Sequence, residues 1–202
     1  MEIKLPGGNV REYDSAKSLN DIANDISPSL KKRSIVARVN DKLVDMDKVV
    51  SDNASVEFIT DSDPEALEVL RHSTAHLLAE TVKKLYPQAH FGVGPVIEDG
   101  FYYDIDLGDT VLSEHDLPAI EKEMKKIAAQ NSMIEREVVS KEKALEIFSD
   151  DPYKLELINE LPESEEISIY KQAHFTDLCR GPHLPGTKWI KNFKLLSLAG
   201  AY

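Results

Sequence analysis

Apolar and polar residues alternate in short runs through the first sixty positions, which is typical of β-strands. Such runs lie at 2–5, 10–13, 35–39, 42–44 and 54–59, with turn-forming residues between them. Between the second and third runs, Ser18 stands at the N-cap position of a short amphipathic helix that contains Ile22 and Ile26. Four or five strands around one helix predict a small ubiquitin-like β-grasp domain.

The pattern changes at 61–64, where turn formers precede a helical period. A long helix is predicted at about 64–86, and a hairpin turn at 99–100. Further helices are predicted at 113–131, 140–148 and 153–161, and strand-like alternation returns at 167–175 and 189–198. The fold class is therefore α+β, with one domain at residues 1–61 and a larger one at 62–202.

Composition narrows the class of protein. Hydrophobic residues make up 42% of the chain and charged residues 30%, a soluble balance without an apolar run that could cross a bilayer or a secretion signal at the start. The single cysteine, Cys179, cannot form an internal disulfide, so we expect a cytoplasmic protein. The apolar ending at 198–202 suggests a chain cut from a longer one.

The formal net charge of −12 bears on possible partners. Non-specific binding to nucleic acids, DNA included, relies on cationic side chains that neutralise phosphates, and the charge argues against it. Recognition of a single RNA end in a local pocket is compatible with this charge.

Two histidines lie inside the long predicted helix. His72 and His76 are four residues apart, so their rings share one face. The apolar stripe of this helix lies nearly opposite them, which argues against core histidines; it comprises Leu67, Leu70, Leu77, Leu78, Val82 and Leu85. A solvated face and accidental spacing stay open as alternatives to a site.

A second cluster lies at 176–183 and contains Asp177, Cys179 and His183. In a strand Asp177 and Cys179 would point the same way, and the Gly-Pro turn at 181–182 would bring His183 to their side. Considered alone, Cys179 is typical of a small buried apolar residue and Asp177 of a turn cap. The presence of this cluster and of the histidine pair in one domain favours a shared site. Three chemistries fit the spacing: a zinc site, acid–base catalysis by histidine, and a Cys–His nucleophile pair.

Three stretches resemble the editing domain of threonyl-tRNA synthetases. They are RHSTAHLL at 71–78, GPVIEDGFYYD at 94–104 and DLCRGPH at 177–183. Residues 1–61 resemble the TGS domain that precedes this domain in the family, so the resemblance covers the whole chain. Editing domains of the alanyl type share only the HxxxH and CxxxH spacing. The resemblance implies a larger domain in which a long helix packs on an antiparallel sheet.

The resemblance also implies a reaction, the hydrolysis of the ester of seryl-tRNA(Thr) with threonyl-tRNA(Thr) spared. One methylene gives only about 1–3 kcal/mol of discrimination, so a second site that excludes threonine by its extra methyl group is needed. By the resemblance, the residues that line the site are His72, His76, Tyr103, Lys154, Asp177, Cys179 and His183.

Individual roles follow as expectations from the resemblance. His72 and Lys154 are expected at the ribose hydroxyls and the water, and Asp177 and His183 at the ammonium and hydroxyl of serine. His76 and Cys179 are expected to shape the pocket, and Tyr103 to contact the terminal adenosine or serine.

The resemblance sets expectations for cofactors and partners. No cofactor is expected, because the family is understood to edit without metal, and zinc at His72, His76, Cys179 and His183 is the disfavoured reading. The expected partner is the 3′ end of tRNA(Thr), with no membrane and no DNA. Lacking the aminoacylation core, the chain is expected to be a monomer that does not charge tRNA, whereas the full-length protein is expected to be a homodimer.

Two alternatives belong to other classes. A zinc-dependent deacylase of the alanyl type would lose activity in chelator. A non-catalytic module that binds RNA or nucleotides would show no deacylation to lose on His72→Ala.

Overall fold

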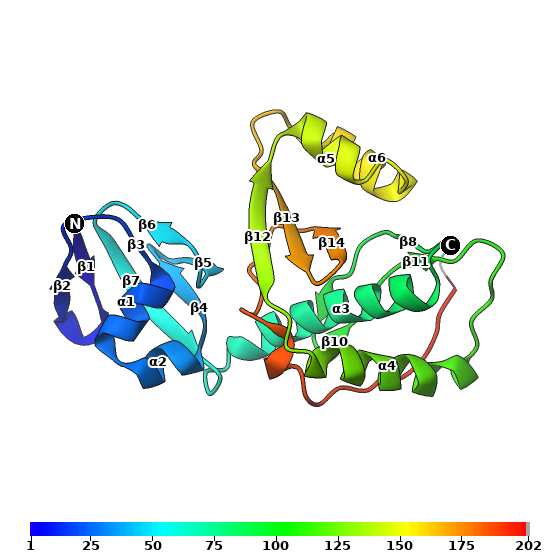
Figure 1. Ribbon diagram of the computed structural model, residues 1–202, viewed down its shortest axis with the longest axis horizontal. Coiled ribbons are helices and arrows are strands. Elements are labelled where there is room, and N and C mark those ends of the chain that lie inside the picture. Colours follow the sequence, from blue (N-terminus) through cyan, green and yellow to red (C-terminus); the bar gives the residue numbers. More distant parts are fainter. Residues whose placement is uncertain (201–202) are drawn as a thin grey trace. The chain divides into compact units, whose positions relative to one another are not determined.

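A computed structural model describes residues 1–200 of the chain (Figure 1). Two compact units are distinguished, residues 1–70 together with Gly181–Pro185, and Arg71–Arg180 together with the residues from Gly186 onward. Within the described residues, no helix is both long enough and apolar enough to cross a membrane. The domain boundary expected after residue 61 stays a prediction.

The first unit is built on a five-stranded sheet with the order β2-β1-β7-β4-β5. Strands β1 and β7 are parallel and the other neighbours are antiparallel. Its elements are β1 (Glu2–Lys4), η1 (Pro6–Gly8), β2 (Val10–Glu12), β3 (Lys17–Ser18), α1 (Leu19–Ile26), α2 (Pro28–Arg33), β4 (Ser34–Val39), β5 (Lys42–Asp45), β6 (Val49–Val50) and β7 (Ala54–Thr60). This confirms the expected α+β class, and all five predicted strands are present.

Local sequence explains most of these elements. The β4–β5 turn places Asn40 and Asp41 at positive φ, 47° and 67°, the conformation that favours Asn and Asp in two-residue hairpins. Ser18 Oγ caps α1 by accepting the Asp21 N–H at 3.1 Å, as predicted. The expectation of one helix is wrong, because a second helix, α2, starts directly after the first. Its N-cap Ser27 and the following proline are a start signal that the hydrophobic pattern does not reveal.

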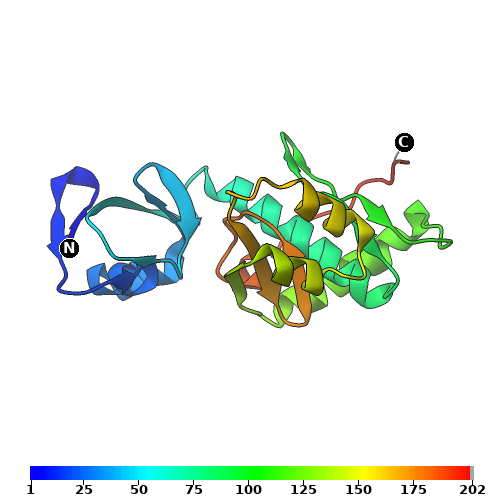
Figure 2. The ribbon, with the colours of Figure 1, turned by 90° about the horizontal axis from the view of Figure 1, so that it is seen from above.

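In the second unit, short antiparallel strands and five further α- and 3-10 helices surround the long helix α3 (Figures 1 and 2). A three-stranded sheet, β12-β13-β14, is the largest of its sheets. The elements are α3 (Ala66–Leu85), β8 (His90–Phe91), β9 (Val96–Ile97), β10 (Gly100–Phe101), β11 (Ile105–Asp106), η2 (Glu114–Asp116), α4 (Leu117–Ala129), β12 (Ile134–Val139), α5 (Lys141–Ile147), α6 (Pro152–Glu160), β13 (Ile167–Gln172), β14 (Phe175–Leu178) and η3 (Thr187–Trp189).

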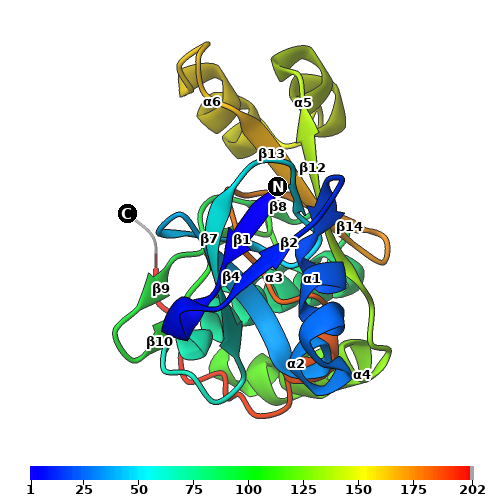
Figure 3. The ribbon, with the colours of Figure 1, turned by 90° about the vertical axis from the view of Figure 1, so that its left-hand side faces the viewer.

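Helices α5 and α6 both lie at the end of the β12–β13 pair (Figures 2 and 3), and they contact each other. Their shared core consists of Ala144, Phe148, Ile158, Ile167 and Ile169. Because Ile167 and Ile169 come from β13, this cluster anchors α6 to the sheet that also carries β14. The start of α6 is thereby held close to the strand that bears Asp177.

Three expectations for the second unit are wrong. Residues 189–198 form no strand, and β12, which was not predicted, supplies the missing partner of β13. The β9–β10 register pairs Ile97 with Gly100, so the turn residues are 98–99 rather than 99–100. The apolar stripe of α3 is not one buried face, since Leu67 and Leu85 are 48% and 41% exposed while residues 73–77 are all buried. The middle of α3 is enclosed on every side, which pattern analysis of a single helix does not reveal.

Candidate functional site

Helix α3 presents His72 and His76 on successive turns. Their ring centroids lie 5.1 Å apart in an edge-to-face arrangement. His76 is 4% exposed and His72 is half-buried, so the pair reaches from the interior of the unit toward its surface. The predicted common face of the two histidines is therefore present, although His76 lies in the core rather than on a solvated face.

Strand β14 and the residue that follows it bring the second cluster to α3. The backbone N–H of Cys179 donates to Ser168 O at 3.2 Å, and the Ser168 hydroxyl donates to Cys179 O at 2.5 Å. These two bonds continue the β13–β14 ladder and fix the direction of the thiol. Cys179 Sγ then lies 3.2 Å from His72 Nε2. Residues more than a hundred positions apart in the chain thus form a His–Cys pair.

Asp177 is the centre of a buried polar network and is 2% exposed. Its Oδ1 accepts from Lys154 Nζ at 3.0 Å and from the Leu178 N–H at 2.8 Å. Its Oδ2 accepts from the Tyr103 hydroxyl at 2.5 Å and lies 3.2 Å from His76 Nδ1. A carboxylate has about four acceptor positions. All four are filled by this chain.

Lys154 is held just as completely. It sits in the first turn of α6 and is 3% exposed. Besides Asp177, its Nζ donates to Gly92 O at 2.8 Å and to the Tyr103 hydroxyl at 3.1 Å, so each of its three N–H groups has a partner. The structure thus gives Lys154 specific partners that its local sequence does not indicate.

Asp151 positions Lys154, and sequence reasoning missed it. Its Oδ1 caps α6 by accepting the N–H groups of Tyr153 and Lys154, and its Oδ2 accepts the Phe91 N–H at 3.0 Å. One carboxylate therefore ties the start of α6 to β8. The Asp-Pro pair that opens α6 is a helix-start signal, and it could have pointed to a cap but not to the contact with β8.

Tyr103 reaches the network from the end of the β9–β10 hairpin. Its ring packs edge-to-face on Phe91, with centroids 5.6 Å apart. Gly94 leaves room for that ring, because a Cβ built on Gly94 would lie 2.4 Å from Tyr103 Cδ2. Arg71, next to His72, donates to Glu98 O at 2.8 Å and fastens the hairpin turn to α3. Gly94 is a second positioning residue that sequence analysis did not single out.

The electrostatic states of the network follow from burial. Burial lowers the pKa of His76 to about 4, against the opposing effect of Asp177, so His76 is neutral at pH 7. Burial would raise the pKa of Asp177, but His76, Lys154 and the bond from Tyr103 outweigh it and lower that pKa. Because His76 is neutral at pH 7, the Lys154 ammonium is the counter-ion under those conditions. Burial, followed by the Asp177 charge, raises the pKa of Tyr103, which keeps its phenol protonated.

These states define which atoms donate. Asp177 can only accept, so the proton of neutral His76 lies on Nδ1 and the lone pair on Nε2. Histidines that act as general bases and histidines that bind metals often have a carboxylate that accepts a hydrogen bond from the other ring nitrogen and so fixes the tautomer. The network can therefore present one imidazole nitrogen as a proton acceptor or as a ligand.

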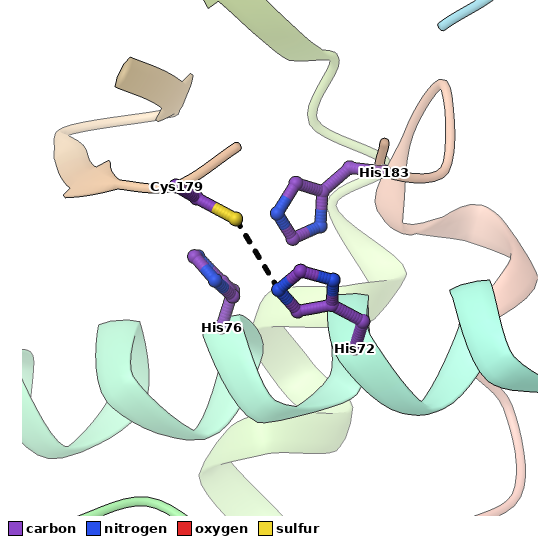
Figure 4. A group of neighbouring side chains, drawn as sticks. All are labelled: His72, His76, Cys179 and His183. Carbon is purple, nitrogen blue, oxygen red and sulfur yellow. Dashed lines mark hydrogen bonds between the residues drawn. The ribbon is translucent and has the colours of Figure 1, made fainter. Parts of the chain in front are cut away.

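His183 completes a group of possible metal ligands. Its backbone N–H donates to Asp45 Oδ1 at 2.9 Å, and its side chain is buried. The ligand atoms of His72, His76, Cys179 and His183 all lie within 4.8 Å of one another, and Figure 4 shows the four side chains turned toward a common point. Nitrogen and sulfur donors in this number suit zinc. The chemistry of the set thus fits a metal as well as acid–base catalysis.

Comparison with known proteins gives two domain matches and a set of relatives. Residues 1–60 match the TGS domain, and residues 167–200 match the threonyl and alanyl tRNA synthetase second additional domain. The whole chain is 52% identical to threonine--tRNA ligase from Staphylococcus saprophyticus, 54% to that from Staphylococcus epidermidis and 53% to that from Staphylococcus carnosus. In each case the match covers 100% of this chain and 31% of the relative.

Proposed function

Because the chain belongs to the threonyl-tRNA synthetase family, whose amino-terminal region it matches, we propose that it removes wrongly attached serine from tRNA(Thr). The observation that carries the proposal is the saturated network around Asp177 beside the half-buried His72–Cys179 pair. A buried network of this kind holds reacting groups in fixed geometry, which ester hydrolysis requires.

Saturation of the hydrogen bonds separates positioning residues from substrate-contacting ones. Asp177 has no acceptor position left for a serine ammonium, and Lys154 has no N–H left for a ribose hydroxyl. We therefore assign both to positioning, in place of the direct contacts expected from sequence. Tyr103 bridges them and holds the wall of the pocket.

His72 is assigned to the water and the ribose hydroxyl. It is half-buried, so solvent and substrate can reach it, and its Nε2 is oriented by the Cys179 thiol at 3.2 Å. A histidine titrates near neutral pH and can take a proton from water and return it to the leaving ribose oxygen. His76 and Cys179 shape the pocket around it, and His183 keeps its expected contact with the amino acid.

Selectivity follows from the size of the amino acid. Discrimination of threonine from serine at a first pocket is limited to about 1–3 kcal/mol, because one methylene separates them. A pocket whose walls are pinned by hydrogen bonds cannot widen for the extra methyl group of threonine. The proposed substrate is therefore the seryl ester on the 3′ adenosine of tRNA(Thr).

The test is hydrolysis of seryl-tRNA(Thr) and threonyl-tRNA(Thr) by the chain. We expect loss of serine and retention of threonine, with His72→Ala at least 100-fold slower. His115→Ala is the matched control, because His115 is an exposed histidine outside the network. Equal hydrolysis of both substrates would refute the selectivity. Unchanged hydrolysis in His72→Ala would refute the assigned role.

A metal-dependent form of the same reaction has one observation in its favour, the four clustered ligand atoms. Bound there, a zinc ion would supply a Lewis acid, and Asp177 would orient His76 toward it. Dialysis against chelator, followed by zinc analysis and a rate measurement, separates the two forms. We propose the metal-free form, for which the rate is unchanged by chelator.

A further inference from the structure

A groove of about 450 Å³ lies at the carboxyl end of α4, away from the network of Asp177. Its lining includes the buried residues Ala128 and Ile190 and three exposed lysines, Lys125, Lys188 and Lys191. None of the lining residues is acidic. In a chain with a net charge of −12, this is a local surface of opposite sign.

Hydrogen bonds fix the two sides of the groove to each other. Thr187, fully buried at the start of η3, donates through Oγ1 to Ala128 O at 3.0 Å and accepts the Ser132 N–H at 3.0 Å. Gly186 permits this approach, because a Cβ there would lie 3.0 Å from Ser132 O. The segment that carries Lys188 is therefore held against the end of the helix that carries Lys125.

The lysines of the groove differ in their partners from three other surface lysines of the same unit. Lys84, Lys143 and Lys171 each form an ion pair with a glutamate. Within the part of the chain that the structure describes, no carboxylate lies within ion-pair distance of the three groove lysines. Two of them lie over aromatic rings instead, Lys125 at 6.0 Å from the Phe193 centroid and Lys188 at 5.1 Å from that of Trp189. A ring attracts the ammonium without neutralising it.

Compensation of the α4 dipole does not account for three lysines. The carboxyl end of a helix carries roughly half a negative charge, which one nearby cation balances. At α4, moreover, Ala128 O already accepts from the Thr187 hydroxyl and from the N–H groups of Gln130 and Asn131. The groove is left with a net positive charge that can hold an anion.

We propose that this groove binds the phosphodiester backbone of an RNA, the body of the tRNA whose 3′ end the editing site receives. The proposal rests on the proposed function for the identity of the RNA. A protein of net charge −12 repels a polyanion, so productive binding requires a local positive surface. Lysines that contact phosphates position an RNA without reading its sequence, which suits a site that acts only on the 3′ end.

The experiment compares two triple variants with equal changes in net charge. One is Lys125→Gln, Lys188→Gln and Lys191→Gln, and the control is Lys84→Gln, Lys143→Gln and Lys171→Gln. Binding of tRNA(Thr) is measured as a function of salt concentration. Each lost phosphate contact lowers the slope of log K against log salt by about 0.7–0.9. The groove variant should therefore lose about two units of slope and about 100-fold in affinity near 0.1 M salt, whereas the control changes less than about threefold.

A small substrate separates this proposal from the proposed function. Hydrolysis of seryl-adenosine requires the editing site alone, so the groove variant should hydrolyse it at the wild-type rate. Complete failure of the wild-type chain to hydrolyse it would overturn the proposed function and leave the binding result standing.

Two results would overturn the groove proposal itself. One is equal loss of RNA affinity in both triple variants, which would mark a general effect of charge. The other is a polyglutamate peptide that binds as tightly as the tRNA with the same dependence on the three lysines, which would identify an acidic protein segment as the occupant.

Discussion

Replacement of Lys154 by methionine leaves the Asp177 carboxylate buried without its counter-ion. The two side chains lie 3.0 Å apart and are 3% and 2% exposed, so solvent does not screen the lost interaction. Methionine keeps the length and apolar volume of the lysine stem. The variant therefore isolates the loss of one buried charge, together with the bonds to Gly92 O and the Tyr103 hydroxyl.

The expected cost is large because one charge of a buried pair is left behind. Removing one partner of such a pair typically destabilises a protein by about 3–5 kcal/mol. With a urea dependence of about 2 kcal/mol per molar, the unfolding midpoint of the second unit should fall by roughly 2 M. Lys143→Met is the control. Lys143 lies on the surface, 3.5 Å from Glu146, where an exposed pair contributes about 0–1 kcal/mol.

The single tryptophan makes the assay specific. Trp189 belongs to the second unit, so its fluorescence reports unfolding of the unit that contains Lys154 even if the first unit unfolds separately. Urea titrations of the wild type, Lys154→Met, Asp177→Asn and the double variant complete a thermodynamic cycle. The double variant should regain part of the loss, because no buried charge remains in it.

The pH dependence gives an independent check of sign. In the wild type the pKa of Asp177 is lowered by folding, so its contribution to stability is present above the unfolded pKa near 4 and is lost below it. In Lys154→Met burial is no longer offset by the ammonium, and the pKa of Asp177 rises. Acidification from pH 7 to 5 should then reduce the difference in the free energy of unfolding between this variant and the wild type. A urea midpoint of Lys154→Met within 0.5 M of that of the control Lys143→Met would refute the reasoning.

Three further outcomes are expected. His76 has a pKa of about 4 in the folded state and about 6.5 in the unfolded chain, so the unfolded chain binds the proton first. The free energy of unfolding of the second unit should therefore fall by about 3 kcal/mol between pH 6.5 and pH 4. Urea titrations of His76→Gln should show a flatter dependence of stability on pH, and an unchanged slope would contradict this. Gly94→Ala should slow deacylation at least tenfold with the circular dichroism spectrum intact, because the new Cβ displaces the Tyr103 ring, whereas Gly100→Ala, which meets nothing within 4 Å, should be neutral. Asp151→Ala should lower the stability of the second unit by about 2–3 kcal/mol through three lost amide bonds, and a thermal melt unchanged from wild type would exclude the role of the cap.

Local signals in the sequence predicted much of the fold. The five strands of the first sheet and the Ser18 cap depend on residues close in the chain, and all are present. The missing element, β12, contains charged residues on a half-exposed strand and has no clear period of two. The prediction of one buried apolar stripe on α3 was wrong at both ends of the helix, because the elements packed around a helix decide which of its residues are buried.

The site shows the same division between local and long-range information. The spacing of His72 and His76 predicted a shared helix face, and the motif at 177–183 placed Asp177 and Cys179 on the same side of a strand. The hydrogen bonds that Lys154 and Tyr103 donate to Asp177 join residues 23 and 74 positions apart in the chain, and no spacing rule predicts such contacts. Asp151 and Gly94 act through backbone amides and through space left open, and neither is visible as a motif.

The complete hydrogen bonding of Lys154 and Tyr103 has an entropic consequence. A long lysine loses roughly 1.5–2 kcal/mol of rotamer freedom when it is fixed. In this protein that loss occurs when the second unit folds, since both side chains already have their partners without any substrate. When a substrate enters the pocket, these side chains do not need to be ordered further. The free energy of substrate binding therefore offsets only the entropy that the substrate itself loses on alignment.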